Sequence, residues 1–234
     1  MAFVFLANPT AGVLDGDRLE VSIRAGAGAR AHVTTPSASK IFTMPEGSAR
    51  QRTDLVVEEG ALLEYMPDPV IPFRGSRFAQ DTRILVHPQA TLIYSDILTP
   101  GRIAHDESMD YCWYRHRLSV RDPKDRPLYY EAFEIAPARR RSRILGVLGR
   151  GQPPVLATLI VVAEGDLSGV IADIPGFARQ ADAIAGASSL PWQGGVVVKV
   201  LSETMAAAQA VIRATWNEVR QLLYAVPAPD LRKY

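Results

Sequence analysis

The feature that most constrains the fold is a strand–turn–strand pattern that returns about every 30 residues. Three segments carry it: VSIRAGAGARAHVTT (21–35), LVVEEGALLEYMP (55–67) and ILVHPQATLIYSD (84–96). Each alternates apolar and polar residues, passes a tight turn with a small alanine, and alternates again, as strands do. The anchor alanines Ala29, Ala61 and Ala90 are 32 and 29 residues apart, and 118–133 resembles a looser fourth copy.

A strand-based repeat of this length predicts stacked layers of strands, as in a β-helix. A sheet without such repeats is the alternative, because any strand-rich chain produces some coincidental spacing. The apolar runs VLATLIVVA (155–163) and GGVVVKVLS (194–202) are typical of further buried strands.

The helical signal is confined to the last third of the sequence. Apolar residues follow three- and four-residue steps at Met205, Ala208, Ile212, Trp216, Val219 and Leu223. We expect Ser202 to cap this helix and Pro227 to end it. The stripe either binds a partner protein or packs on the chain's own sheet. A shorter helix is predicted over 178–184, after the turn at Pro175-Gly176. The prediction is one mainly β domain over 1–234, with stacked layers and about two C-terminal helices.

Charge and composition exclude several classes of partner. The chain has 26 basic and 25 acidic residues, which gives no long-range field for nucleic acid or an anionic membrane. Its longest apolar runs are too short to span a bilayer, and MAFVFLA lacks the basic flank of a signal peptide. The single cysteine, Cys112, favours a reducing compartment. We therefore expect a cytoplasmic protein.

Enzyme motifs are weak. GAGARA (26–31) matches a dinucleotide fingerprint, but a strand follows it in place of the helix that would bind the pyrophosphate. The sequence has no P-loop, no G-x-S-x-G and no H-E-x-x-H. On one extended strand Cys112 and His116 lie about 13 Å apart, too far for a nucleophile and its base.

His105, Asp106 and Glu107 form the one dense cluster of metal-capable side chains. These residue types suit divalent ions such as nickel or zinc. Adjacent residues of a strand point to opposite sides, so at most two of them could share an ion. A solvated loop is the plainer interpretation.

Two carboxylates interrupt apolar strands: Asp96 in LIYSDIL and Glu131 in PLYYEAF. Carboxylates in a core are paired, protonated or hydrated, because a dry unpaired charge is costly. These strands therefore have a wet face, or the two side chains line something.

Several segments, in order, resemble the urease accessory protein UreD (UreH) family. They are NPTAGVLDGDRL (8–19), TTPSASKIF (34–42), GALLEYMPDPVIPFRGSRF (60–78), GRIAHDE (101–107), RPLYYE (126–131) and the closing ATWNEVRQLLYAVPAPDLR. The likeness is collinear over nearly the whole chain, which makes it more specific than any single piece.

The resemblance implies a scaffold that catalyses nothing and has no cofactor of its own. Members bind UreF, which recruits the GTPase UreG, and the assembly docks on the urease apoenzyme for nickel insertion. Nickel would be handled transiently, and GTP would belong to UreG. The family's polar positions, thought to border an internal passage for nickel, correspond to Asp17, Asp96, Arg102, Glu107 and Glu131.

Two other hypotheses come from different classes. One is a metal-dependent hydrolase that uses His105, Asp106 and Glu107. The other is a β-solenoid binding protein unrelated to urease.

Overall fold

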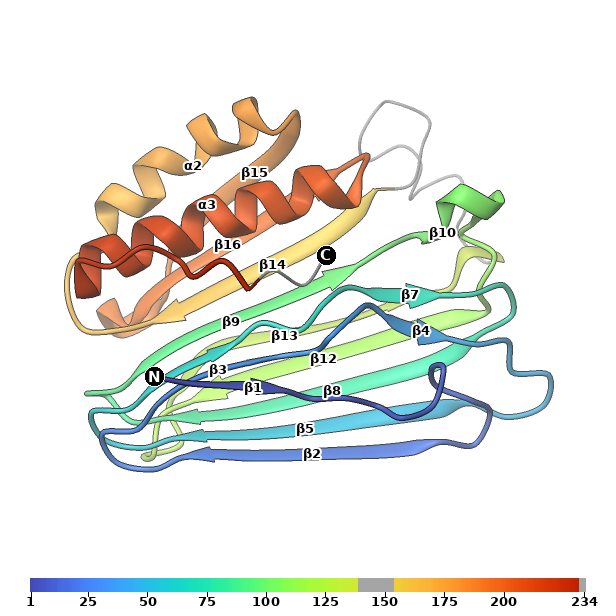
Figure 1. Ribbon diagram of the computed structural model, residues 1–234, viewed down its shortest axis with the longest axis horizontal. Helices are drawn as coiled ribbons and strands as arrows, with labels where there is room; N and C mark the ends of the chain where they lie inside the picture. The colour runs from blue at the N-terminus through green and yellow to red at the C-terminus, as the bar shows by residue number, and fades with distance from the viewer. Residues whose placement is uncertain (139–153, 232–234) are drawn as a thin grey trace.

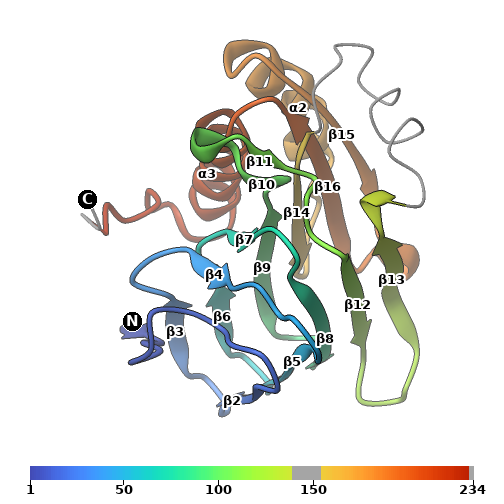
Figure 2. The ribbon, with the colours of Figure 1, turned by 90° about the vertical axis from the view of Figure 1, so that its right-hand side faces the viewer.

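The computed structural model describes residues 1–138 and 154–231. Two sheets face each other, and two helices cover the outer side of the larger sheet (Figure 1, Figure 2). The five-stranded sheet has the order β13-β12-β8-β5-β2. Its strands are β2 (Arg18–Ala25), β5 (Ala49–Val57), β8 (Arg77–Val86), β12 (Trp113–Arg121) and β13 (Pro127–Ile135).

The larger sheet has nine strands, with β1-β3-β6-β9-β14-β16-β15 as its main path. They are β1 (Ala2–Phe5), β3 (Arg30–Thr34), β4 (Ser39–Ile41), β6 (Leu62–Tyr65), β7 (Val70–Pro72), β9 (Thr91–Leu98), β14 (Val155–Val162), β15 (Ala183–Ser189) and β16 (Gly195–Ser202). The helices are α2 (Ser168–Gln180) and α3 (Met205–Tyr224).

The predicted repeat is confirmed as three stacked coils. In each coil a strand of the five-stranded sheet (β2, β5 or β8) turns into one of the larger sheet (β3, β6 or β9), and successive coils pair in parallel. The three turns close alike: the N–H groups of Ala29, Ala61 and Ala90 each bond the carbonyl three residues back, at 2.9, 3.0 and 2.9 Å. The anchor alanines therefore mark one turn repeated three times.

The prediction of a fourth copy over 118–133 is wrong, because this segment does not form a coil. Strand β12 does extend the stack in parallel with β8, but β13 returns antiparallel in the same sheet, with Leu118 opposite Glu131. Asp122 stabilises the intervening turn, where its carboxylate accepts the N–H groups of Lys124 and Arg126 at 2.9 and 2.8 Å. This hairpin ends the coils, and β14, β16 and β15 then extend the larger sheet as antiparallel strands.

Three apolar clusters hold the three layers together. The first fills the space between the sheets at the end near the alanine turns and includes Leu55, Leu63 and Leu92. The second lies between the larger sheet and the helices and includes Leu159, Val198 and Trp216. The third lies between the sheets at their other end and includes Ile41, Phe78 and Leu98. Strands β9, β14 and β16 are apolar on both faces because they contribute to the first two clusters.

Helix α3 matches the predicted stripe, but its start was misplaced. Thr204 is the N-cap, and its hydroxyl accepts the N–H of Ala207 at 3.2 Å. Ser202 ends β16 and donates its hydroxyl to the Thr204 carbonyl. Most of the stripe, including Ile212 and Trp216, is buried against the chain's own sheet. The stripe is therefore part of the core, as the second of the two expectations held.

The prediction of a shorter helix over 178–184 is wrong beyond its first three residues. Helix α2 runs over Ser168–Gln180 and contains Pro175, while 183–189 form strand β15. Val170, Ile174 and Ala178, at four-residue steps, are buried under this helix. Their packing outweighs the turn signal of Pro175-Gly176. Neither described helix is long and apolar enough to cross a membrane.

Candidate functional site

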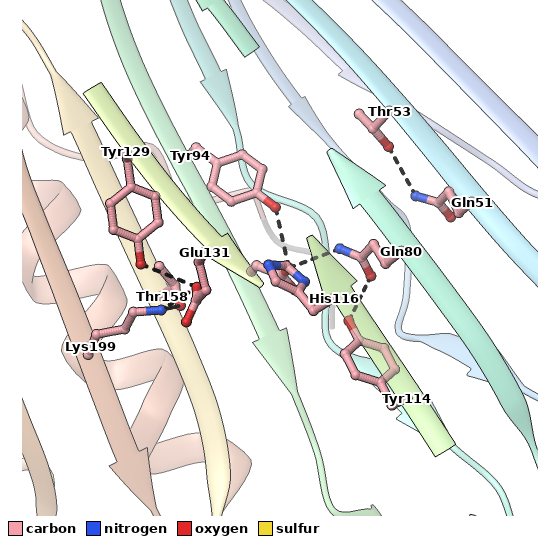
Figure 3. Close-up of polar contacts among 11 residues, drawn as sticks. Gln51, Thr53, Gln80, Tyr94, Tyr114, His116, Tyr129, Glu131, Thr158 and Lys199 are labelled. Atoms are coloured by element: carbon pink, nitrogen blue, oxygen red, sulfur yellow. Dashed lines mark hydrogen bonds and ion pairs between the residues drawn. The ribbon is translucent and has the colours of Figure 1, made fainter. Parts of the chain in front are cut away.

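Polar side chains form a row across the interior, between the two apolar ends of the sandwich. We call this set the interior polar row: Gln51, Thr53, Gln80, Thr82, Tyr94, Asp96, Tyr114, His116, Tyr129, Glu131, Thr158 and Lys199. Figure 3 shows most of these side chains pointing toward one another from strands of both sheets. A hydrated interior is the expected setting for such a row.

Asp96 is the centre of the row's more buried half. Its Oδ2 accepts hydrogen bonds from the Gln80 amide at 2.9 Å and the Tyr94 hydroxyl at 3.3 Å, and lies 3.3 Å from His116 Nδ1. Gln80 and His116 belong to the five-stranded sheet, so these contacts join the two sheets. Within the described residues no donor contacts the other oxygen, Oδ1, which leaves that atom free to accept a ligand.

Glu131 is the centre of the more exposed half. Its Oε2 accepts from Lys199 Nζ at 2.5 Å and from the Tyr129 hydroxyl at 3.2 Å. Lys199 also donates to Thr158 Oγ1 at 2.8 Å. Oε1 of Glu131 has no such partner in the part of the chain that the structure describes. Among the described residues, Asp96 and Glu131 therefore each use one oxygen and keep the other free.

Strand register explains why these groups meet. Thr158 of β14 lies opposite Asp96 of β9 on one side and opposite Lys199 of β16 on the other. Residues in register point to the same face of a sheet, and neighbouring strands are about 4.8 Å apart. Asp96, Thr158 and Lys199 therefore form one line across three strands, and Glu131 faces that line from β13.

A cavity of about 340 Å³ lies along this line. Asp96, His116, Glu131, Thr158 and Lys199 all lie on its wall. The side chains of His116 and Asp96 are 4% and 11% exposed, whereas those of Glu131 and Lys199 are 21% and 42% exposed. Exposure thus rises from Asp96 to Lys199, and the cavity is most accessible at Lys199.

The tyrosines of the row act as hydrogen-bond donors. Burial raises the pKa of Tyr94 and Tyr114 well above 10, and the nearby Asp96 carboxylate adds to the rise. Both hydroxyls therefore stay protonated at neutral pH. Tyr114 donates to Gln80 Oε1 at 2.9 Å, which orients the Gln80 amide toward Asp96.

The structure brings together two of the five predicted passage residues, Asp96 and Glu131. Asp17 lies in a surface turn before β2, where its carboxylate accepts the N–H of Leu14 at 2.8 Å. Arg102 and Glu107 pair with each other across the short strands β10 (Gly101–Arg102) and β11 (Glu107–Ser108). None of these three residues lies on the wall of the cavity.

The cluster at 105–107 does not converge on one point. His105 and Asp106 are exposed, whereas Glu107 is buried and receives both Arg102 and the Arg74 N–H. Across residues 1–138 and 154–231, no three His, Cys, Asp or Glu side chains are placed to hold one metal ion. The geometry therefore gives no support to a hydrolase built on His105, Asp106 and Glu107.

Four members of the row were not predicted from the sequence: Gln80, His116, Thr158 and Lys199. Lys199 has the same signal that identified Asp96 and Glu131, because it is a charged residue within an apolar strand, VVVKVLS. His116 and Gln80 have no comparable signal, since neither interrupts an apolar run: His116 stands between two arginines, and Gln80 is followed by Asp81.

Comparison with known proteins gives one family for nearly the whole chain. A family model described as UreD urease accessory protein matches residues 1–233. A protein named Urease accessory protein UreD 2, from Streptomyces griseus, is 37% identical over 242 residues, which cover 100% of this chain and 80% of that protein. A Urease accessory protein UreD from Haloarcula marismortui is 37% identical, covering 99% of this chain and 77% of its own length. One from Photorhabdus laumondii is 35% identical, covering 98% of this chain and 72% of its own length.

A match over the whole chain excludes an unrelated β-solenoid protein. It also places the chain among accessory proteins that serve urease maturation. The chain therefore belongs to the UreD family of urease accessory proteins.

Proposed function

We propose that this chain is a urease maturation factor that passes nickel through its interior to the urease apoenzyme. It docks with UreF and UreG on apo-urease, catalyses nothing itself, and leaves GTP hydrolysis to UreG. Nickel is its cargo and no resident cofactor is needed. Family membership supports the role in urease maturation.

One observation carries the nickel part of the proposal. Asp96 and Glu131 come from different sheets and line the same cavity, and each keeps one carboxylate oxygen free of contacts with the residues that the structure describes. Separate oxygens with room for water bind a divalent cation weakly, and a passage needs weak binding at several points. A site with three or four converging ligands would retain the ion.

His116 adds an imidazole to this cavity wall. Imidazole suits nickel better than it suits magnesium or calcium, which prefer oxygen ligands only. The cavity therefore offers nickel a contact that the more abundant hard cations do not use. A passage role for Asp17, Arg102 and Glu107 stays a prediction, because these residues lie away from the cavity.

The proposal predicts the effect of the double variant Asp96→Asn plus Glu131→Gln. Both changes keep the shape of the side chains and one oxygen that can accept the present hydrogen bonds, but they remove the charge. We expect lower urease activity and less nickel per active site, with UreF and UreG recovered as before in a pull-down from the same lysate.

Full activation by the double variant would refute the passage. Loss of the complex would show that the two residues have a structural role. Arg115→Met together with Glu134→Gln is the matched control, since it removes an exposed ion pair on the outer face of the five-stranded sheet.

A further inference from the structure

The ammonium group of Lys199 occupies a position that is built for a cation. Glu131 Oε2 lies 2.5 Å from Nζ and Thr158 Oγ1 lies 2.8 Å from it. The Tyr129 ring, whose centroid is 5.7 Å from Nζ, adds the negative face of an aromatic ring. A carboxylate and a hydroxyl oxygen are also ligands that divalent cations accept.

The groups that surround the ammonium are fixed in place, whereas the ammonium itself can move away. Thr158 is fixed by pairing with both β9 and β16, and Glu131 is held by the Tyr129 hydroxyl. Lys199, in contrast, has a long flexible side chain that is 42% exposed. A partly exposed lysine pair contributes little to stability, so the ammonium can withdraw to water at small cost.

We propose that Glu131 and Thr158 form a divalent-cation site for which Lys199 is a tethered competitor. This inference rests on the proposed passage and specifies how the passage admits its cargo. An arriving cation takes the place of the ammonium beside Glu131, and the lysine turns to solvent. When the cation moves on to Asp96, one strand beyond Thr158, the ammonium returns.

The competitor accounts for weak binding at a carboxylate that is four-fifths buried. Without Lys199, a divalent ion would meet the negative charge of Glu131 without the ammonium that now lies 2.5 Å from it. With Lys199 present, every binding event must first displace a unit positive charge, and this lowers the apparent affinity. The lysine therefore keeps the cation exchangeable.

The test is the affinity of the full chain for Ni²⁺ alone, measured by equilibrium dialysis and repeated with Mg²⁺. Lys199→Met should lower the Kd for Ni²⁺ by at least about tenfold, because a positive charge next to the ion is removed. Lys199→Arg should leave the Kd unchanged or raise it, since the planar guanidinium pairs with a carboxylate more rigidly. Adding Glu131→Gln to Lys199→Met should abolish the gain.

Arg115→Met is the control, because it removes the same charge from an exposed pair outside the cavity, and its Kd should not change. An unchanged Kd in folded Lys199→Met overturns the proposal. If that variant does not fold, Lys199→Gln provides the same test. Tighter binding in Lys199→Met, with normal urease activation by the Asp96 and Glu131 double variant, would refute the passage but keep the cation site.

Discussion

The ion pair between Arg102 and Glu107 gives Glu107 a structural role. Arg102 binds both carboxylate oxygens of Glu107, at 2.8 and 2.5 Å, and the Arg74 N–H contacts one of them at 3.3 Å. The hydrogen bonds from Arg102 lower the pKa of Glu107 to about 2, although desolvation opposes this shift. A paired carboxylate of this kind stabilises the short β10–β11 hairpin.

We expect the pair to make stability depend on pH. The folded-state pKa lies below the unfolded value of about 4.3, so the contribution is complete above that value and disappears as the pH falls through about 2. The difference in urea midpoint between the natural chain and Glu107→Gln should therefore shrink to roughly half by pH 3. A difference that is constant from pH 6 to pH 3 would contradict this assignment.

Charged residues in apolar strands were a useful but ambiguous signal. Asp96 and Glu131 proved to line a cavity, as one of the two expectations held. Glu64 has the same signal in ALLEYMP, yet it lies under α3, where His32 and Arg220 pair with it at 2.8 and 2.5 Å. The sequence could not separate these cases, because the partners come from segments 32 and 156 residues away.

At the level of elements, the pairing of β14 with β16 depends on a close backbone contact at Gly195. Gly195 opens β16 with φ of 135°, and a Cβ there would lie 1.8 Å from the Val161 carbonyl oxygen. Only glycine fits, because both the backbone angle and the space exclude a side chain. The pairing of β14 with β16, which aligns Thr158 and Lys199, begins at this contact.

Gly195→Ala should therefore destabilise the fold by about 2–4 kcal/mol, through backbone strain and overpacking together. Urea unfolding followed by circular dichroism measures the change. Gly169→Ala, in the first turn of α2 with open space around it, should change stability by less than about 1 kcal/mol. Equal effects of the two substitutions would contradict the packing argument.

Helices, strands and turns could be predicted where a local sequence pattern alone determines the structure. The alanine turns and the stripe of α3 were found because each follows a local period. The β12–β13 hairpin and α2 were misjudged because their outcome depends on tertiary packing. The turn at Asp122 decides whether the chain crosses between the sheets, and burial of Ile174 decides whether Pro175 lies inside a helix.

At the level of the whole molecule, passage of nickel through the interior requires an open path between the two sheets. Strand alternation places Leu156 two residues before Thr158 on the same face of β14, and Leu156 lies on the cavity wall. Replacing it with tryptophan would fill the cavity while leaving the charges of Asp96, Glu131 and Lys199 unchanged. This change separates a passage from a merely electrostatic role of the row.

The most direct measurement is nickel per urease active site after maturation with the Leu156→Trp chain. Leu85→Trp, on the outer face of the five-stranded sheet where Leu85 is 39% exposed, is the matched control. We predict that Leu156→Trp lowers the nickel content several-fold while UreF and UreG still co-purify, and that Leu85→Trp leaves it unchanged. Full nickel content with Leu156→Trp would contradict transport through this cavity.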